Sequence, residues 1–397
     1  MKNLFIIFLF LFPALSFAQT DEAKEYLKKI FTDDKIEYQK IFDKSVFKAV
    51  SEEKLKEIVN EYKTKLGELN YIDGKDGVYD VICKNGKTES KVTLNKENLI
   101  VGFWFGQLNL FNDTLETIVE ELKKHEGTLS INIVKNNKDK VFALNETEPL
   151  GVGSAFKLFV LKALNEKIKQ KKAKWETVIK TDKNYFSLQS GFLQTWEDKS
   201  PITLKSLANL MISISDNTAT DLLITYLGRD FVEKYSPKRV SPFLKTSEMF
   251  KLKWGVDKKV TENFINGSPK EKLQILKDIE KFDINKVKFD ASPTLISKLE
   301  WFISAKELCE VIYDVKDNTA LQINTGIGLK KDKWNYVGYK GGSEPGVLNL
   351  TFLVQKEKIS DYYCVSVTLN NESKEVDQKK IIELVSRLVV LIENKKI

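Results

Sequence analysis

Hydrophobic residues recur at helical spacing through the first part of the chain. Between about residues 20 and 66 they stand three or four positions apart among charged side chains, which predicts amphipathic helices. The positions that carry this pattern are Ile30, Phe31, Tyr38, Ile41, Phe42, Leu55, Ile58, Val59 and Tyr62. Turn signals follow at Asp73-Gly74 and Asp76-Gly77.

Three short strand-like runs come next, at residues 78–83, 90–94 and 99–105. Asn85-Gly86 separates the first two runs and predicts a hairpin turn. Helices followed by antiparallel strands predict a small α+β domain, which we place at residues 19–112. It contains no cluster of the residue types that catalysis uses, so we expect a docking or positioning role, with a possible protein contact.

The pattern changes after residue 112. Asp113-Thr114-Leu115-Glu116 predicts the start of a helix with a side-chain cap. Strand-like runs at 129–134 and 141–144 flank a turn at Asn136-Asn137, and a mostly helical stretch then spans roughly 154–315. The chain ends with strand-like runs near 336–339, 347–354 and 362–369, and a helix from about 376 to 393. Two strands before the helical block and three after it predict one antiparallel sheet.

The first residues have the composition of a secretory signal peptide. Lys2 precedes an almost wholly apolar run over residues 4–15, and Ser16-Phe17-Ala18 supplies small residues at both recognition positions. The run is too short to span a bilayer, and Pro13 interrupts it. We therefore expect residues 1–18 to be removed by cleavage after Ala18. The mature protein is then periplasmic or secreted, with no transmembrane segment.

The histidine count excludes the most familiar hydrolase sites. His125 is the single histidine among 397 residues, so sites with two or more histidine ligands are impossible. A Ser-His-Asp or Cys-His site would have to use His125, which stands at the end of a predicted helix and reads as a solvated residue. The length and the 42% hydrophobic content suit two globular domains. We expect no metal and no cofactor.

The charged residues indicate solvated surfaces rather than a nucleic-acid site. The net charge is +7, and only Arg229, Arg239 and Arg387 are arginines. Lysine and glutamate are interspersed along the chain, as on solvated helix faces. Nucleic-acid sites use the planar fork of arginine and concentrated basic stripes, so we expect no nucleic-acid partner.

The cysteines do not form a recognisable framework. They are odd in number, widely spaced and placed in apolar runs: Cys83, Cys309 and Cys364. Each reads as a small buried residue. One disulfide is possible, and the sequence leaves open whether any two of them pair.

Without a histidine, a lysine of lowered pKa can activate a serine nucleophile. S-x-x-K spacing, which puts both residues on one helix face, occurs at Ser45/Lys48, Ser51/Lys54 and Ser154/Lys157. The first two pairs lie in charged helical surroundings. Ser154 instead follows the glycine-containing segment 149–153, and Lys157 lies in an apolar run that would desolvate it. The alternative is a serine helix cap beside a lysine that reaches solvent.

Two further motifs decide between these readings. Ser215-Asp216-Asn217 lies between two helical runs, and Tyr339-Lys340-Gly341-Gly342-Ser343 ends one strand and precedes another. Each alone would be an ordinary cap or turn. In this order and at these separations, the three motifs resemble those of the penicillin-recognising serine enzymes, and of class A β-lactamases most closely. The resemblance extends over residues 113–397.

The resemblance implies a fold for each part of the chain. Residues 113–397 are expected to form an α+β domain of the β-lactamase/transpeptidase type, with helices on both faces of an antiparallel sheet and a helical subdomain. The preceding domain, together with segments 242–246 and 300–302, is similar to a two-domain subgroup that carries a cystatin-like domain.

The resemblance also assigns roles to the matching residues. Ser154 attacks the substrate carbonyl, and Lys157 accepts its proton. Ser215 relays a proton to the leaving nitrogen, assisted by the charge of Lys340. Asn217 binds the amide side chain of the substrate. The N–H groups of Ser154 and Ser343, next to Gly342, would form an oxyanion hole.

Two departures from the family pattern bear on the substrate. Gly341 replaces the hydroxyl residue that usually holds a substrate carboxylate, and no arginine lies on the strands after Lys340. Ser343 could compensate. Deacylation needs a base, and there are two candidate glutamates. Glu248 stands at about the expected separation from Ser215, whereas Glu262 begins the segment 262–266, which resembles the E-x-x-L-N motif of the family. Neither follows an arginine as in the family, and a surface or ion-paired glutamate is the alternative for each.

These observations lead to three functional hypotheses. The first is an exported serine hydrolase that opens β-lactams through an acyl-enzyme, as β-lactamases do. The second is an esterase or peptidase with another small acyl substrate. The third is a slowly deacylating penicillin-binding sensor. The lifetime of the acyl-enzyme would separate them.

Overall fold

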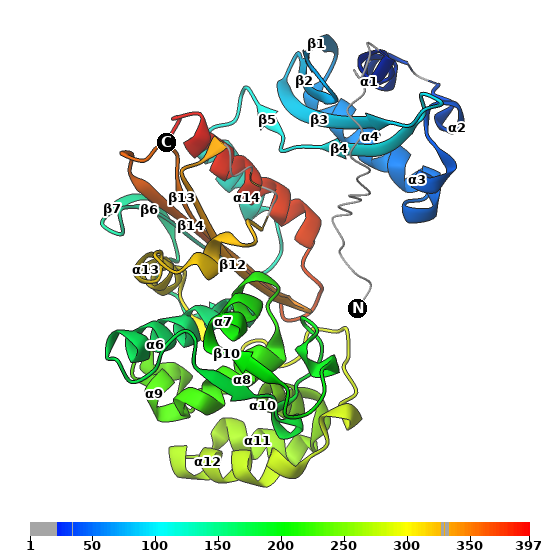
Figure 1. The fold of residues 1–397 in the computed structure, drawn as a ribbon. Coiled ribbons are helices and arrows are strands. Elements are labelled where there is room, and N and C mark those ends of the chain that lie inside the picture. The colour runs from blue at the N-terminus through cyan, green and yellow to red at the C-terminus, as the bar shows by residue number, and fades with distance from the viewer. Residues whose placement is uncertain (1–21, 34, 327–328, 330–332) are drawn as a thin grey trace. The chain divides into compact units, whose positions relative to one another are not determined.

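A computed structural model of the chain describes residues 22–33, 35–326, 329 and 333–397 (Figure 1). Backbone contacts group it into two units, Met1–Glu121 with Glu383–Ile397, and Leu122–Ile382. Each unit has a hydrophobic core of its own. Helices α5 (Leu115–Lys123) and α14 (Gln378–Glu393) cross the boundary between the two units. The predicted signal peptide lies outside the described residues.

Short helices fill the early part of the first unit, as the hydrophobic spacing predicted. They are α1 (Glu22–Thr32), α2 (Tyr38–Ile41), α3 (Lys44–Ala49) and α4 (Glu52–Leu66). Ser51 caps α4, because its hydroxyl accepts the Lys54 N–H at 3.3 Å. Gly67, with a φ of 76°, ends the helix. The Ser51/Lys54 pair is therefore a helix start.

An antiparallel sheet completes the first unit. Its strands are β1 (Leu69–Lys75), β2 (Val78–Cys83), β3 (Gly86–Leu94), β4 (Ile100–Phe105) and β5 (Asn109–Leu110), with β5 paired to β3. The three predicted strands and the β2–β3 hairpin are confirmed. The predicted turn at Asp73-Gly74 is wrong, because both residues lie inside β1. A Cβ on Gly74 would be 2.3 Å from the Val78 carbonyl oxygen, so this glycine marks a close approach of two strands.

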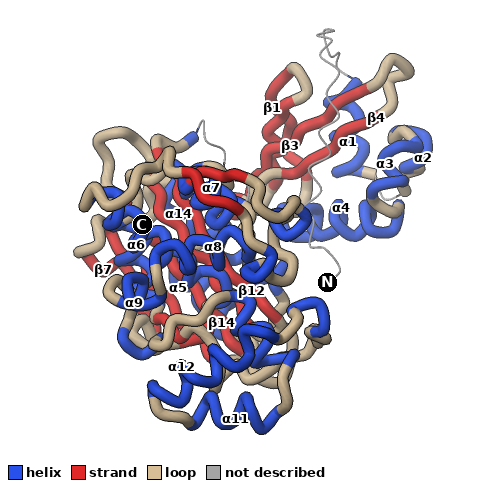
Figure 2. The backbone as a smooth tube through the Cα atoms, turned by 60° about the horizontal axis from the view of Figure 1, so that its bottom comes forward, coloured by secondary structure: helices blue, strands red, loops and turns tan. Residues whose placement is uncertain are grey.

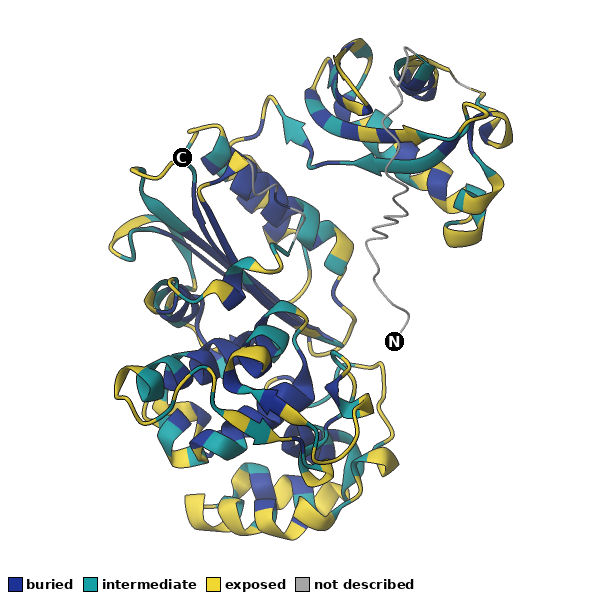
Figure 3. Cartoon of the chain, viewed as in Figure 1, coloured by how far each residue is buried: buried dark blue, intermediate teal, exposed yellow. Residues whose placement is uncertain are grey.

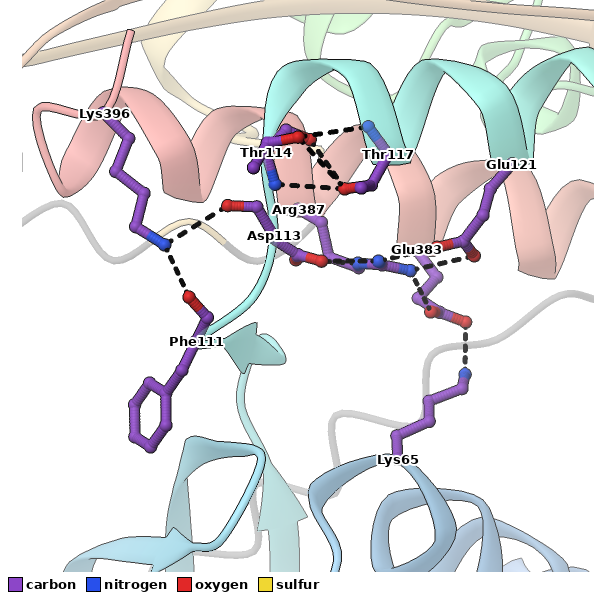
Figure 4. A network of polar contacts seen from close by, with 9 residues as sticks. All are labelled: Lys65, Phe111, Asp113, Thr114, Thr117, Glu121, Glu383, Arg387 and Lys396. Carbon is purple, nitrogen blue, oxygen red and sulfur yellow. Dashed lines mark hydrogen bonds and ion pairs between the residues drawn. The ribbon is translucent and has the colours of Figure 1, made fainter.

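A buried arginine organises a polar network within the first unit (Figure 4). Arg387 on α14 donates to both carboxylate oxygens of Asp113, at 2.9 and 2.6 Å, and pairs with Glu121 at 2.8 Å. Glu383, one turn earlier, accepts from Arg387 and from Lys65 on α4. Burial opposes the charge of Arg387, but the hydrogen bonds that it donates to Asp113 and Glu121 outweigh this effect and raise the pKa of Arg387. The predicted place of Arg387 in the final helix is confirmed.

The second unit is built on an antiparallel sheet of order β12-β13-β14-β6-β7. Its strands are β6 (Thr128–Lys135), β7 (Asp139–Leu144), β12 (Tyr336–Glu344), β13 (Val347–Gln355) and β14 (Tyr362–Asn370). The predicted sheet of two early and three late strands is confirmed. The strand-like run expected near 336–339 is longer than predicted, because β12 continues through Lys340-Gly341-Gly342 to Glu344 and pairs with β13 throughout.

Helices with short strands between them fill the part of the chain from β7 to β12 (Figure 2). They are α6 (Lys157–Lys169), α7 (Leu204–Ser213), α8 (Asn217–Leu227), α9 (Arg229–Glu233), α10 (Thr246–Phe250), α11 (Lys258–Asn266), α12 (Pro269–Asp278) and α13 (Ala305–Asp314). The short strands β8 (Leu150–Gly151) and β11 (Phe302–Ile303) pair with each other. Strands β13 and β14 and helices α6 and α8 are largely buried, whereas α11 and α12 are largely exposed (Figure 3). The chain has an α+β fold, with an antiparallel sheet and a block of helices, as the sequence predicted.

Cys309 on α13 and Cys364 on β14 form a disulfide. Both lie in the core of the second unit, whereas Cys83 is free and buried in the first. The sequence had left this pairing open. Within the described part of the chain, no helix combines the length and the apolar character that a membrane span requires.

Candidate active site

Ser154 lies in a tight turn directly before α6. The turn is a 3-10 segment, Gly153–Phe156, and it enters α6 without a break, so the N–H of Lys157 donates back to the Ser154 carbonyl. Gly153 adopts the left-handed conformation that glycine favours, with a φ of 48°. Ser154 itself is half-buried while its neighbours are buried. The predicted nucleophile is therefore reachable from outside on an otherwise rigid turn.

Strand β12 lies so close to this turn that only glycine fits between them. A Cβ on Gly342 would be 2.3 Å from the backbone nitrogen of Ser154 and 2.2 Å from the Val152 carbonyl oxygen. A Cβ on Gly153 would be 3.0 Å from the backbone nitrogen of Ser343. The backbone nitrogens of Ser154 and Ser343 therefore lie close together. An oxyanion hole requires two N–H groups close together, so the predicted role of these two donors stays a prediction that this proximity allows.

Lys157 is fully buried and surrounded by oxygen atoms. Its Nζ lies 2.6 Å from the Ser215 carbonyl oxygen, 2.7 Å from Asn217 Oδ1 and 3.1 Å from Ser215 Oγ. Burial, followed by the nearby positive charge of Lys340, holds the pKa of Lys157 well below its usual range. A neutral amine has two N–H donors and one lone pair. It can serve the two carbonyl-type oxygens and keep its lone pair for a hydroxyl proton.

Ser215 lies between two lysines. Its Oγ is 3.1 Å from Lys157 Nζ and 3.1 Å from Lys340 Nζ. Ser215 has a φ of 58°, a conformation that costs energy for a residue with a side chain. Burial lowers the pKa of Lys340 to about 7. A hydroxyl between two lysines of lowered pKa can pass a proton from one amino group to the other.

Asp216 holds this turn in place, a role that the sequence did not reveal. Its Oδ1 caps α8 by accepting the Ala219 N–H, and its Oδ2 accepts the N–H groups of Phe192 and Leu193, each at 2.8 Å. Gly191 has a φ of 80°, and a Cβ there would be 2.2 Å from Asp216 Oδ2. The segment around Gly191 therefore wraps the carboxylate and fixes the backbone of its neighbours Ser215 and Asn217.

Asn217 is buried and uses both ends of its amide. Its Oδ1 accepts from Lys157, and its Nδ2 donates to the Leu188 carbonyl oxygen at 3.1 Å. Asn217 therefore positions the lysine. The second proton on Nδ2 has no partner among the described residues, which leaves one donor for the predicted contact with a substrate amide.

Glu248, the first candidate base, is held by two partners. One carboxylate oxygen accepts from Arg229 at 2.6 Å, and the other accepts the Lys245 N–H at 2.7 Å. Its segment is anchored to α8, because the Thr246 hydroxyl donates to Asp221 and Asp221 also accepts the Ser247 N–H. The second candidate, Glu262, is exposed on α11. No hydrogen bond joins either glutamate to Ser154, Lys157 or Ser215 among the described residues.

A second buried charge cluster lies at the end of β12, and no local pattern in the sequence indicated it. Lys253 pairs with both Glu300 and Glu344, and the side chains of Lys253 and Glu300 have no exposed surface. Burial, followed by the neighbouring Glu300 carboxylate, raises the pKa of Glu344 well above its usual range. Glu344 directly follows Ser343, so the cluster anchors the strand end that carries a predicted oxyanion donor.

Comparison with known proteins identifies the family of the chain. A sequence model described as "Beta-lactamase enzyme family" matches residues 111–391. No curated protein matches the chain. Three solved structures are similar to it: a β-lactamase from Sphaerobacter thermophilus DSM 20745 (18% identity, TM-score 0.48, 70% of this chain and 96% of that one), an ancestral class A β-lactamase named GNCA (17%, 0.49, 70% and 98%) and PBP-A (14%, 0.48, 70% and 95%).

Proposed function

The chain belongs to the beta-lactamase enzyme family, and from that premise we propose that it is an exported serine acyl hydrolase. Its reaction passes through an acyl-enzyme on Ser154, and a β-lactam amide is the first substrate class to test. The observation that carries the proposal is the arrangement of Ser215 Oγ at 3.1 Å from the amino groups of both Lys157 and Lys340. This arrangement supplies a base and a proton relay without a histidine.

The acylation step begins with neutral Lys157. As Ser154 Oγ bonds to the substrate carbonyl carbon, the hydroxyl proton passes to the lone pair of Lys157 Nζ, directly or through water. The carbonyl oxygen takes up negative charge, which the N–H groups of Ser154 and Ser343 stabilise. Each such donor contributes about 3 kcal/mol to acyl transfer in enzymes where it has been removed.

Collapse of this intermediate breaks the bond to the leaving nitrogen or oxygen. The leaving atom takes the Ser215 hydroxyl proton, and Ser215 regains a proton from Lys157 or Lys340. The net result is a Ser154 ester and a protonated leaving group, with every proton accounted for. Lys340 also contributes positive charge at the leaving atom while it remains protonated.

A second candidate function is a slowly deacylating acceptor, which would act as a penicillin-binding sensor. It is favoured by Glu248, whose carboxylate is occupied by Arg229 and the Lys245 N–H. Both carboxylate oxygens already accept a hydrogen bond, which leaves fewer acceptor positions for a catalytic water. Glu248 as deacylation base stays a prediction, and so does Glu262. Replacing each with glutamine and measuring the acyl-enzyme lifetime tests them separately.

Export is part of the proposal and has two supports. The first 18 residues have the parts of a signal peptide. The Cys309–Cys364 disulfide suits an oxidising compartment such as the periplasm. The first unit contributes no group to the proposed chemistry, and its cystatin-like fold and its contact with a partner protein stay predictions.

The test is the intact mass of the protein after mixing with a penicillin or a cephalosporin. We expect the wild-type chain to gain the mass of the opened lactam and the Ser154→Ala variant to gain none. Ser45→Ala is the matched control, because Ser45 has the same S-x-x-K spacing but lies exposed on α3. An adduct on Ser154→Ala, or no adduct and no turnover with any β-lactam, ester or amide, would contradict the proposal.

A further inference from the structure

A tyrosine hydroxyl occupies the place of the missing side chain at position 341. Gly341 follows Lys340 directly on β12, the edge strand of its sheet. A Cβ built on Gly341 would lie 2.2 Å from Tyr339 Oη and 2.9 Å from Tyr339 Cζ. The phenol of Tyr339 therefore lies over Gly341, where a side chain of the strand would otherwise begin. Any larger residue at 341 would collide with it.

The ring of Tyr339 is held on two sides. Its centroid lies 4.6 Å from that of Phe352, which is its direct partner on β13. A Cβ on Gly326 would lie 2.8 Å from three ring atoms, so the backbone of Gly326 packs on the ring face. A phenol with two rotatable torsions is thereby fixed in one orientation, with its oxygen beside Gly341.

The hydroxyl of Tyr339 is available to a ligand. The hydroxyl has no hydrogen-bond partner among the described residues, and Tyr339 is only partly buried. Buried tyrosine hydroxyls usually find a partner, as Tyr336 on the same strand does by donating to the Lys316 carbonyl oxygen. Burial also raises the pKa of Tyr339, so its hydroxyl stays a neutral donor and acceptor.

None of the three arginines of the chain is directed to Gly341. Leu350 is its direct partner on β13. The three arginines of the chain are each paired with carboxylates elsewhere, on Glu248, Glu307 and Asp113. Among the described residues, Lys340 directly precedes Gly341 on the strand, and with a pKa of about 7 it is only partly charged at neutral pH. A carboxylate beside Lys340 would lose its hydration against a partial counter-charge.

We propose that Tyr339 is a specificity-determining residue whose hydroxyl hydrogen-bonds a neutral polar group of the substrate beside Gly341. The site then prefers acyl substrates whose leaving portion is neutral, such as an ester or a carboxamide, over substrates that carry a carboxylate there. This inference rests on the proposed acyl transfer to Ser154. It names the substrate class for that reaction.

A matched substrate pair tests the preference in the wild-type protein. Two acylglycyl phenyl esters are compared, one with a meta carboxylate on the leaving phenol and the other with its methyl ester. Acylation rates are divided by the rates of hydroxide hydrolysis, which removes the difference in intrinsic reactivity. We expect the neutral ester to react at least about tenfold faster. An equal rate, or a faster carboxylate ester, would overturn the proposal.

Variants of the strand identify the residue responsible. Tyr339→Phe keeps the ring and should lower kcat/KM for the neutral ester by about fivefold to tenfold, the effect of one lost hydrogen bond, mainly through KM. Tyr336→Phe is the matched control, because it removes a phenol from the same strand that is bonded to Lys316. The proposal fails if Tyr339→Phe and Tyr336→Phe change the neutral-to-carboxylate ratio equally.

A double variant tests the proposal by moving the hydroxyl from residue 339 to residue 341. Gly341→Thr alone should be poorly tolerated, because its Cβ meets Tyr339 Oη at 2.2 Å. Tyr339→Ala with Gly341→Thr removes the collision with Oη. The new Cβ still lies 2.9 Å from the Asn349 carbonyl oxygen, so the strand must shift slightly to place the threonine hydroxyl there. The ratio of rates should then shift toward the carboxylate ester. Failure of the proposed function itself looks different, because wild-type Ser154 would then react with neither ester nor any β-lactam.

Discussion

The buried cluster at the end of β12 should make the stability of the second unit depend on pH through one proton. Lys253 supplies one positive charge against the carboxyls of Glu300 and Glu344. With both carboxyls ionised, the cluster would carry a net negative charge in the core. Burial and then the Glu300 carboxylate raise the pKa of Glu344 above its ordinary value of 4.5, which keeps a proton in the cluster.

The direction of the effect follows from the unfolded chain. Unfolded Glu344 releases its proton near its ordinary pKa, whereas the folded protein holds it to higher pH. The stabilisation is therefore complete below the ordinary value and is lost as the pH rises toward the folded pKa. One proton corresponds to a slope of at most about 1.4 kcal/mol in unfolding free energy per pH unit. Glu344→Gln, which needs no proton, should flatten the curve and be the more stable protein at alkaline pH.

Urea unfolding followed by tryptophan fluorescence, from about pH 5 to about pH 9, measures this slope. Glu262→Gln, an exposed change on α11, is the control and should leave the wild-type slope unchanged. Lys253→Met should instead cost about 3–5 kcal/mol, because it leaves two carboxyls buried without their cation. Parallel curves for the wild type and Glu344→Gln would refute the reasoning.

Three other predictions concern the site and the disulfide. Ser215→Ala should slow acylation by about 10² or more in stopped-flow assays, because the leaving atom loses its proton donor; Ser213→Ala is the control, and equal rates would exclude the relay. Lys340 has a pKa of about 7, so it loses its charge above that pH and acylation of a β-lactam should decline there. Lys340→Arg should move the decline to higher pH, because arginine stays charged. An unchanged pH profile of acylation would contradict a role for the charge of Lys340. Cys309→Ser should remove about 4 kcal/mol of stability in urea unfolding, from a loop of 55 residues, and wild type in reducing agent should match it.

Much of the fold follows from local patterns. The strands β2, β6, β13 and β14 and the helix α14 lie within a residue or two of their expected bounds, because each has a continuous apolar pattern. Two of the errors occurred at glycines, and the short strands β9 (Val178–Lys180) and β10 (Pro201–Thr203) lie inside the stretch expected to be mostly helical. Asp73-Gly74 and Gly341-Gly342 carry turn composition but lie inside strands, where glycine is required by the close approach of another backbone. That requirement comes from a distant segment, so no local pattern contains it.

The candidate site also has a part that short motifs indicate and a part that depends on distant segments. Ser154, Lys157, Ser215, Asn217 and Lys340 were found because short motifs carry them, and the structure brings the lysines and the serine hydroxyl of Ser215 together. Their roles remain predictions. The partners of Glu248 and Glu344 and the pairing of two cysteines depend on segments far away in the chain. Charge composition cannot reveal them, since lysine and glutamate occur throughout the sequence.

The order of strands in the second unit also bears on when the protein can react. Ser154 follows β7, but the edge strand β12 carries Lys340 and Ser343 and enters the sheet only after the whole helical block. Contacts between such distant segments require a large loop-closure entropy, and they can form only once β12 has been synthesised. We therefore expect Ser154 to be unreactive toward acyl donors while the chain is still being synthesised or exported. A chain truncated before β12 should form no Ser154 adduct, so reactivity itself would report that folding is complete.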